Sequence, residues 1–193
     1  MDAAVFVNAR PIPPAPGPGA SARRLAEILR VDHAGELGAV NIYRGQRAVL
    51  DGALGREKIT RQLVEMEAHE ARHLARFDAL LTDARVRPTL LAPLWRAAGF
   101  ALGAGTALMG EKAAHACTEA VETVIEAHYA GQIEEIGERH PDLAAELVQF
   151  RDEELAHRDQ AVAEGAREAP GYPILAAVIR AGCRAAIRLS EKL

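Results

Sequence analysis

The stretch EARH at residues 70–73 is followed later in the chain by ELAH at residues 154–157, and this repeated Glu-x-x-His motif decides the fold. In an α-helix, residues three positions apart lie on one face, so each motif presents a carboxylate and an imidazole together. A further glutamate precedes each motif at nearly the same distance, Glu36 before the first and Glu122 before the second. The sequence therefore predicts two related helical hairpins, each supplying one Glu and one Glu-x-x-His.

Helix-breaking residues are sparse around these motifs, and the segments between them are long. Breaks are predicted at residues 51–52, at Pro88 and at residues 140–141, and no strand-like alternation appears. The predicted helices span residues 21–50, 56–85, 92–109, 111–139, 141–168 and 174–189. Four of them reach roughly 42 Å, which is bundle length. The predicted fold is all-α, a four-helix bundle with an apolar connecting helix and an amphipathic C-terminal helix.

The composition agrees with a helical globular chain and excludes several classes of function. Of the 193 residues, 49% are hydrophobic and 26% charged, which excludes wholesale disorder, and only 4% are aromatic, which favours helices over sheets. The net charge of −4 leaves no basic excess for a nucleic-acid partner. Cys117 and Cys183 form no Cys-x-x-Cys pair, which excludes zinc ribbons and disulfide scaffolds, and both are predicted to be small core residues.

The first 20 residues differ from the rest of the chain. Residues 10–19, RPIPPAPGPG, indicate an extended, proline-rich flexible leader, and we expect the folded domain to occupy residues 21–193. The apolar run at residues 3–7 is too short for a secretory signal, and the Arg/Ser-rich pattern of a transit peptide is missing. We therefore expect a bacterial-type chain on the cytoplasmic side of the membrane.

Six acidic and histidine side chains fall inside the apolar stripes of the predicted helices. They are Glu36, Glu70, His73, Glu122, Glu154 and His157. Buried carboxylates are costly to keep ionised, and four together repel one another. No Lys or Arg is placed to compensate this charge, whereas metal cations would compensate it. The set is that of di-iron and di-manganese carboxylate bundles, and it contains no thiolate that would favour zinc.

Other acidic residues and histidines lie off these stripes and are predicted to be solvated or to cap helices. They are Glu67, Glu119, Glu126, Glu135, Glu153, His69, His115 and His140. A single Glu-x-x-His on an alanine-rich helix usually marks a solvated face, so the metal prediction depends on the repeat. A metal-free structural bundle and a ferritin-like iron oxidase or storage protein stay open as alternatives.

The amino-acid sequence around these residues resembles that of a known family. The matching stretches are RVDHAGELGAVNIYRGQ (30–46), residues 85–122, HYAGQI (128–133), FRDEELAHRD (150–159) and AGCRAAIRLSEKL (181–193). Over about residues 21–193 the chain closely resembles the demethoxyubiquinone hydroxylase family of ubiquinone biosynthesis. The resemblance implies a ferritin-like fold and an O₂-dependent monooxygenase that hydroxylates the ring of a polyprenyl demethoxyubiquinol, giving demethylubiquinol.

The resemblance also implies roles for particular residues and cofactors. Two iron ions would be held by the six Glu and His residues given above, and an external reductant, with NADH as the candidate, would supply electrons. His128 and Tyr129 match a catalytic His-Tyr pair placed between the quinone and the metal. Tyr129 shares a helical stripe with Glu122, so the His-Tyr pair could hydrogen-bond a quinone oxygen or relay an electron or proton to the irons. Core packing is the alternative role for Tyr129.

Two segments bear on how such a chain meets a lipid-like substrate. Residues 97–110 carry no charge but are too short to span a bilayer, which takes about 20 residues. Arg180, Arg184 and Arg188 form one stripe of the last predicted helix, opposite apolar residues, which is typical of an interfacial anchor. Ordinary core or dimer-interface helices are the alternative. We expect peripheral membrane binding, a polyprenyl quinol taken from lipid, a homo-oligomer and partners from ubiquinone biosynthesis.

Overall fold

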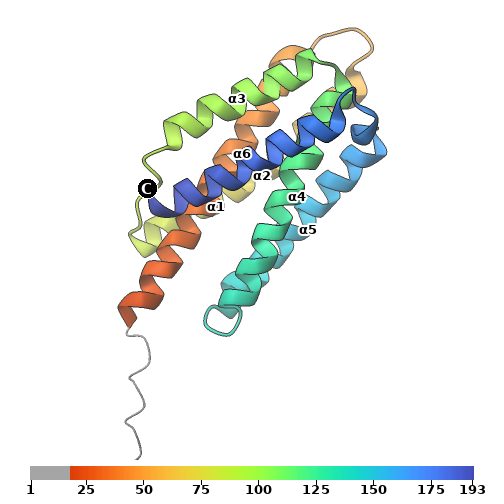
Figure 1. The fold of residues 1–193 in the computed structure, drawn as a ribbon. Coiled ribbons are helices and arrows are strands. Elements are labelled where there is room, and N and C mark those ends of the chain that lie inside the picture. The colour runs from red at the N-terminus through yellow and green to blue at the C-terminus, as the bar shows by residue number, and fades with distance from the viewer. Residues whose placement is uncertain (1–17) are drawn as a thin grey trace, which may run out of the picture.

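The computed structural model describes residues 18–193, and Figure 1 shows them as a bundle of long helices. The elements are α1 (Pro18–Leu50), α2 (Glu57–Ala84), α3 (Ala92–Leu108), α4 (Glu111–Ile136), α5 (Pro141–Ala163), the 3-10 helix η1 (Ala166–Glu168) and α6 (Tyr172–Lys192). No strand occurs within residues 18–193. The all-α, ferritin-like prediction is confirmed.

The helix ends differ from the predicted ones by a few residues. α1 begins at Pro18, inside the predicted leader, while the leader's residues 1–17 lie outside the described residues. α5 stops at Ala163 because Gly165 adopts a left-handed backbone with φ of 88°, and η1 follows instead of a continued α-helix. The division of the chain at residue 20 stays a prediction.

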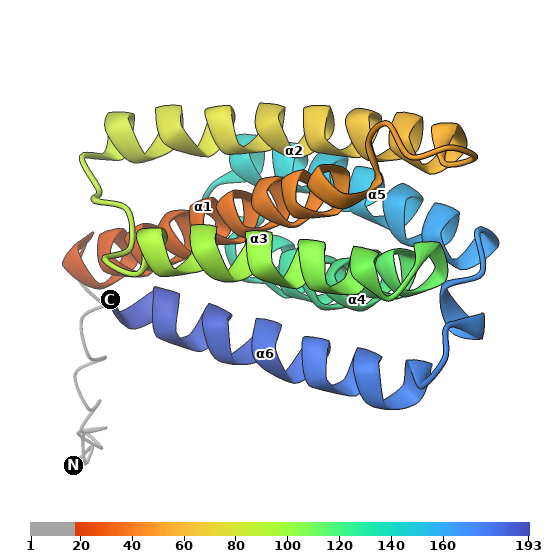
Figure 2. The same ribbon diagram turned by 90° about the horizontal axis from the view of Figure 1, so that it is seen from above.

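The helices form three layers, with α1 and α4 in the middle. α2 and α5 cover one side of this pair, and α3 and α6 cover the other (Figure 2). Glycines let α3 lie very close to α1, since a Cβ at Gly103 would fall 1.9 Å from the Ile42 carbonyl oxygen and one at Gly99 would fall 2.6 Å from that of Gly38. The predicted connecting helix thus forms part of the third layer, together with α6.

The bundle of α1, α2, α4 and α5 has apolar ends and a polar middle. Ile28 and Phe77 belong to the apolar cluster at one end, and Leu50 and Leu63 belong to the cluster at the other. Each buried side chain of this size contributes about 1.5–3 kcal/mol to folding. These two clusters fix the helices on both sides of the charged residues between them.

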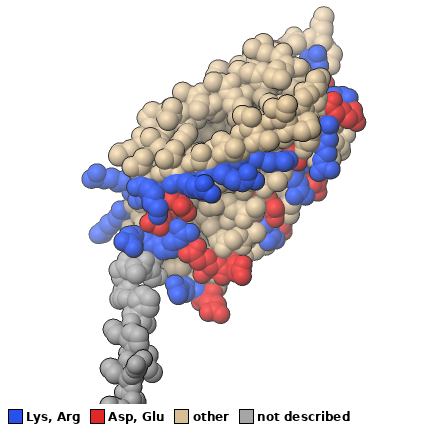
Figure 3. All heavy atoms as spheres, in the orientation of Figure 1, with Lys and Arg blue, Asp and Glu red and all other residues tan. Residues whose placement is uncertain are grey.

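The outer layer leaves large apolar side chains on the surface. We define the α3/α6 face by the exposed Leu90, Leu94, Phe100, Leu108, Met109, Ile174 and Val178. Figure 3 shows a broad uncharged area over these helices, bordered by a row of lysine and arginine atoms. Within the described residues, no helix has both the length and the hydropathy required to cross a membrane.

Candidate metal centre

The six predicted metal ligands meet in the middle of the bundle. Glu36 comes from α1, Glu70 and His73 from α2, Glu122 from α4, and Glu154 and His157 from α5. All six are buried, with at most 4% of each residue exposed. Helical periodicity turns them inward, because each lies on a stripe of its helix that also carries buried core residues, such as Val40 on α1, Phe77 on α2 and Leu147 on α5.

Their ligand atoms form two groups of four. Glu36, Glu70, His73 and Glu154 make one group, and Glu70, Glu122, Glu154 and His157 make the other. Within each group the atoms lie within 4.8 Å of one another. Because Glu70 and Glu154 belong to both groups, the arrangement suits two neighbouring cations joined by shared carboxylates.

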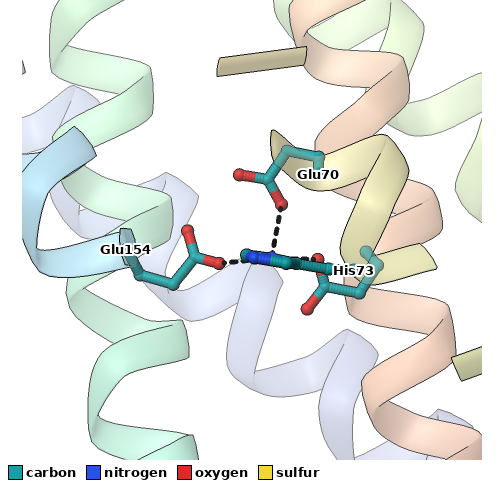
Figure 4. A group of neighbouring side chains, drawn as sticks. Glu70, His73 and Glu154 are labelled. Atoms are coloured by element: carbon teal, nitrogen blue, oxygen red, sulfur yellow. Dashed lines mark ion pairs between the residues drawn. The ribbon is translucent and has the colours of Figure 1, made fainter. Parts of the chain in front are cut away.

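Both histidines turn the same ring nitrogen toward the carboxylates. His73 Nδ1 lies 3.1 Å from Glu154 Oε1 and 3.9 Å from Glu70 Oε2 (Figure 4), and 3.5 Å from Glu36 Oε2. His157 Nδ1 lies 3.2 Å from Glu70 Oε1 and 3.3 Å from Glu154 Oε2. The two imidazoles therefore face one common centre from α2 and α5.

The electrostatics of the cluster favour added positive charge. Burial and the neighbouring carboxylates raise the pKa of Glu70 well above its usual range, and burial with Glu154 does the same to the pKa of Glu122. Burial lowers the pKa of His73, but the adjacent Glu154 and Glu36 outweigh this effect and raise it to about 10. A positive charge at this centre would therefore stabilise the ionised carboxylates.

Unpaired polar atoms show that a metal fits here. Among the described residues, buried atoms without a hydrogen-bond partner include Glu36 Oε2, Glu70 Oε1, His73 Nδ1, both Glu154 oxygens and His157 Nδ1. Buried polar groups are ordinarily satisfied, and each exception needs an explanation. Carboxylate oxygens with imidazole nitrogens suit iron or manganese, so the atoms left unpaired are those that such ions would bind.

A second ring of contacts holds these side chains. His73 Nε2 lies 3.1 Å from Glu153 Oε2, and His157 Nε2 lies 3.0 Å from His69 Nδ1. Such outer partners fix the tautomer and orientation of ligand histidines. Glu153 and His69 had been predicted to be solvated or capping, yet both contact candidate ligands while staying partly exposed. Each contact joins α2 to α5, so the spacing of residues along one helix could not predict it.

Two tyrosines bind cluster carboxylates from within the core. The Tyr43 hydroxyl donates to Glu122 Oε1 at 2.8 Å, and the Tyr129 hydroxyl donates to Glu36 Oε1. Tyr129 therefore lies close to the centre, and Tyr43, for which the sequence predicted no role there, contacts it as well. His128 lies further out, with its Nε2 3.3 Å from Asp32 Oδ1.

An apolar cavity of about 380 Å³ reaches the cluster from the side of α3 and α6. Its polar lining at the inner end comes from Asp32, Glu36, His128 and Tyr129. Its apolar walls include Ile42, Leu102, Ile125, Ile179 and Ile187. A ligand in this cavity would contact Glu36, which is one of the candidate metal ligands.

Two of the residues predicted to be solvated or capping are in fact buried. Glu119 is 2% exposed, and the Arg180 guanidinium donates to both of its carboxylate oxygens at 2.8 Å. His115 is 3% exposed, and burial lowers its pKa. Both predictions were wrong because α4 is enclosed by neighbouring helices on nearly all sides, so its outer face is also interior. Cys117 is a core residue, as predicted, and Cys183 lines the cavity.

Comparison with known proteins adds a second line of observation. Residues 23–190 match the family described as "Ubiquinone biosynthesis protein COQ7". The 3-demethoxyubiquinol 3-hydroxylase of Rhodospirillum rubrum is 51% identical over 178 residues, covering 92% of this chain and 82% of that protein. The human mitochondrial NADPH-dependent 3-demethoxyubiquinone 3-hydroxylase is 51% identical over 170 residues, covering 86% and 76%. The mitochondrial 5-demethoxyubiquinone hydroxylase of Saccharomyces cerevisiae is 41% identical, covering 90% and 80%.

Proposed function

The chain belongs to the COQ7 family of ubiquinone biosynthesis proteins, and we propose that it hydroxylates the ring of a polyprenyl demethoxyubiquinol with O₂ at a di-iron centre. It is an enzyme of the hydroxylase class, since its relatives at 51% identity carry that activity in their names. These names do not support the iron oxidase or storage alternative.

One observation carries the proposal: the apolar cavity ends on Glu36 of the metal cluster. A storage protein needs a path for ions, which apolar walls oppose, whereas a polyprenyl quinol needs apolar walls and a few polar groups at one end. The cavity has mostly apolar walls, and four of its polar residues, Asp32, Glu36, His128 and Tyr129, lie together next to the cluster. Its volume of about 380 Å³ is within the range of small-molecule sites.

The residues of the chain divide the chemical work. Glu36, Glu70, His73, Glu122, Glu154 and His157 are the proposed ligands of two iron ions. When bound, the ions supply the redox chemistry that activates O₂. The Tyr129 hydroxyl holds the Glu36 carboxylate at the inner end of the cavity. The apolar walls exclude bulk water from the ring during the reaction.

The α3/α6 face supports the proposal that the enzyme binds a membrane surface. Each methylene of an isoprenoid tail gains roughly 0.8 kcal/mol by leaving water, so the substrate resides in lipid. Exposed apolar residues of α3 and α6 lie beside the cavity, and the exposed Arg184 and Arg188 can meet anionic headgroups. Arg180, which the sequence predicts to be part of the same basic stripe, donates its hydrogen bonds to Glu119 and is therefore not proposed as a headgroup contact.

Further partners are proposed on the same basis. A reduced nicotinamide is the proposed electron source, and the names of the human and rat relatives call those proteins NADPH-dependent. The α3/α6 face also offers apolar surface for a second copy of the chain or for another protein of ubiquinone biosynthesis. The homo-oligomer therefore stays a proposal.

A quinone profile of cells lacking the protein tests the proposed function. Demethoxyubiquinone should accumulate, the parent chain should restore ubiquinone, and Glu154→Ala should fail to restore it although the protein is produced. Iron analysis of the purified parent should give two ions per chain. Normal ubiquinone in the deletion strain would refute the function, and a metal-free purified protein with full activity would refute the metal centre.

A further inference from the structure

Asp32 is a buried carboxylate that the metal cluster does not use. It lies one helical turn before Glu36 on α1, so both side chains point to the same side of the helix. Its side chain is fully shielded from solvent, yet it lines the inner end of the cavity beside His128 and Tyr129. It is absent from both groups of potential metal ligands found among the described residues. A carboxylate in this place needs another explanation.

Only one oxygen of this carboxylate is bound. Asp32 Oδ1 accepts a hydrogen bond from Gln132 Nε2 at 2.7 Å and lies 3.3 Å from His128 Nε2. Asp32 Oδ2 is buried and has no hydrogen-bond partner within residues 18–193. Burial raises the pKa of Asp32 above its usual value, and His128 and Gln132 offset only part of this shift. Leaving such an acceptor unpaired costs free energy, so Oδ2 is a candidate to accept a hydrogen bond from a bound ligand.

The two redox forms of the substrate differ in what they offer to this oxygen. The quinol ring carries two hydroxyl groups, which can donate hydrogen bonds, whereas the quinone carries two carbonyl groups, which can only accept them. A carboxylate only accepts. The names of the relatives mention both forms, demethoxyubiquinol for Rhodospirillum rubrum and demethoxyubiquinone for the human protein.

We propose that Asp32 Oδ2 accepts a hydrogen bond from a ring hydroxyl of the substrate, so that Asp32 selects the reduced quinol over the quinone. The inference rests on the proposed function, because it takes the cavity as the quinol site. Gln132 and His128 are positioning residues that keep the carboxylate in place. A quinone in the same pose would set its carbonyl oxygen against Oδ2, leaving two buried acceptors unpaired.

The exchange Asp32→Asn tests this selection with almost no change in volume. The amide oxygen can still accept from Gln132, and the amide nitrogen then replaces Oδ2, turning an acceptor into a donor. We therefore expect the preference to reverse. The parent should bind the quinol about tenfold to a hundredfold more tightly than the quinone, as expected for a hydrogen bond to a charged group, and the variant should favour the quinone.

Calorimetry on the full-length protein measures both affinities. The protein is loaded with Mn²⁺, which suits the same ligands, and titrated under nitrogen with short-tailed demethoxyubiquinol and with its quinone. Leu102→Ala is the matched control, because it removes an apolar part of the wall and should weaken both forms by the same factor. The ratio of the two affinities separates hydrogen-bond selection from any general loosening of the cavity.

The outcomes distinguish the two levels of the proposal. A parent that binds both forms equally, or an Asp32→Asn variant with the parental ratio, overturns the role of Asp32 while leaving the proposed function in place. A parent that binds neither form overturns the proposed function as well. Should the variant not fold, the parent titrated with the dimethyl ether of the quinol decides alone, since loss of the hydroxyl donors should cost the same tenfold to hundredfold.

Discussion

The central helices α1 and α4 have two sides that bury opposite kinds of surface. Toward α2 and α5 they enclose carboxylates and imidazoles whose atoms are unpaired among the described residues. Toward α3 and α6 they enclose an apolar cavity, and the outermost surface exposes leucine, phenylalanine and isoleucine. One pair of helices thus separates the charged centre of the enzyme from its apolar outer layer, and Glu36 and Tyr129 lie where the two meet.

The largest expected effect comes from the bundle side, at a carboxylate shared by both groups. Glu154→Ala removes a ligand from each group, so we expect loss of both irons and activity at background. Glu122 belongs to one group only, so Glu122→Ala should keep the other ion. Iron per chain, measured by atomic spectroscopy, checks both variants. Two irons and full activity in Glu154→Ala would show that the ligand assignment is wrong.

On the cavity side, filling the space should stop turnover without touching the metal. Gly182 of α6 lines the cavity, and a Cβ there meets no heavy atom within 4 Å. Gly182→Leu should therefore occupy the substrate space and lower kcat/KM by roughly a hundredfold, the cost of about 3 kcal/mol of lost binding, with iron content unchanged. Gly131→Leu on α4 is the matched control, because its Cβ is equally free and lies outside the cavity. Equal activity in the two variants would contradict the substrate site.

The two sides also differ in how well the sequence predicted them. The bundle side depends on helical spacing, so Glu36, Glu70, His73, Glu122, Glu154 and His157 could all be placed at one centre from periodicity alone, although their role as ligands stays a prediction. The helix order followed from the same pattern and from breakers such as Pro141.

The α3 and α6 side was harder to predict because it depends on contacts between distant segments. From the sequence, Glu119 is predicted to be a solvated charge and Arg180 a contact to lipid headgroups. In the structure α6 packs on α4, and the two residues form a hydrogen-bonded ion pair. Asp32 could be recognised as a candidate binding residue only from the structure, in which it lines the cavity together with residues of α3 and α6. The close packing of the α3 glycines against α1 is a further contact between distant segments that the sequence did not predict.

The ion pair that fastens α6 to α4 should matter for stability and not for membrane binding. Arg180→Met leaves Glu119 buried without its partner, which should lower the free energy of unfolding by about 2–3 kcal/mol. Denaturant unfolding of the parent and the variant checks this. The double variant Glu119→Gln with Arg180→Met should recover most of the loss, since no buried charge then remains unpaired. An unchanged midpoint in Arg180→Met would show that the pair is dispensable.

The exposed arginines of the same helix should show the opposite pattern. Arg184→Gln with Arg188→Gln removes two exposed charges, each worth about 1 kcal/mol at an anionic membrane surface. Binding to anionic liposomes should fall roughly thirtyfold at low salt and less at high salt, where screening weakens the parent as well. The unfolding midpoint should not move. If the variant binds liposomes as well as the parent does, the two arginines do not contribute to membrane binding. The apolar residues of the α3/α6 face would then have to provide it.

The smallest expected effect concerns the boundary between the two sides. Tyr43 and Tyr129 each donate a hydrogen bond to a cluster carboxylate, but only Tyr129 lines the cavity among the described residues. Phenylalanine at either position keeps the packing and removes the hydroxyl, which costs about 1.5 kcal/mol, the lower end of the range for a hydrogen bond to a charged group. If the Tyr129 hydroxyl serves only to hold Glu36, the two variants should lose similar activity, within about tenfold of the parent. If it also contacts the quinol, Tyr129→Phe should raise KM and lower kcat beyond Tyr43→Phe, with the same iron content. Steady-state kinetics on a short-tailed quinol separates these cases, and we expect the second, because the hydroxyl lies where the cavity meets the cluster.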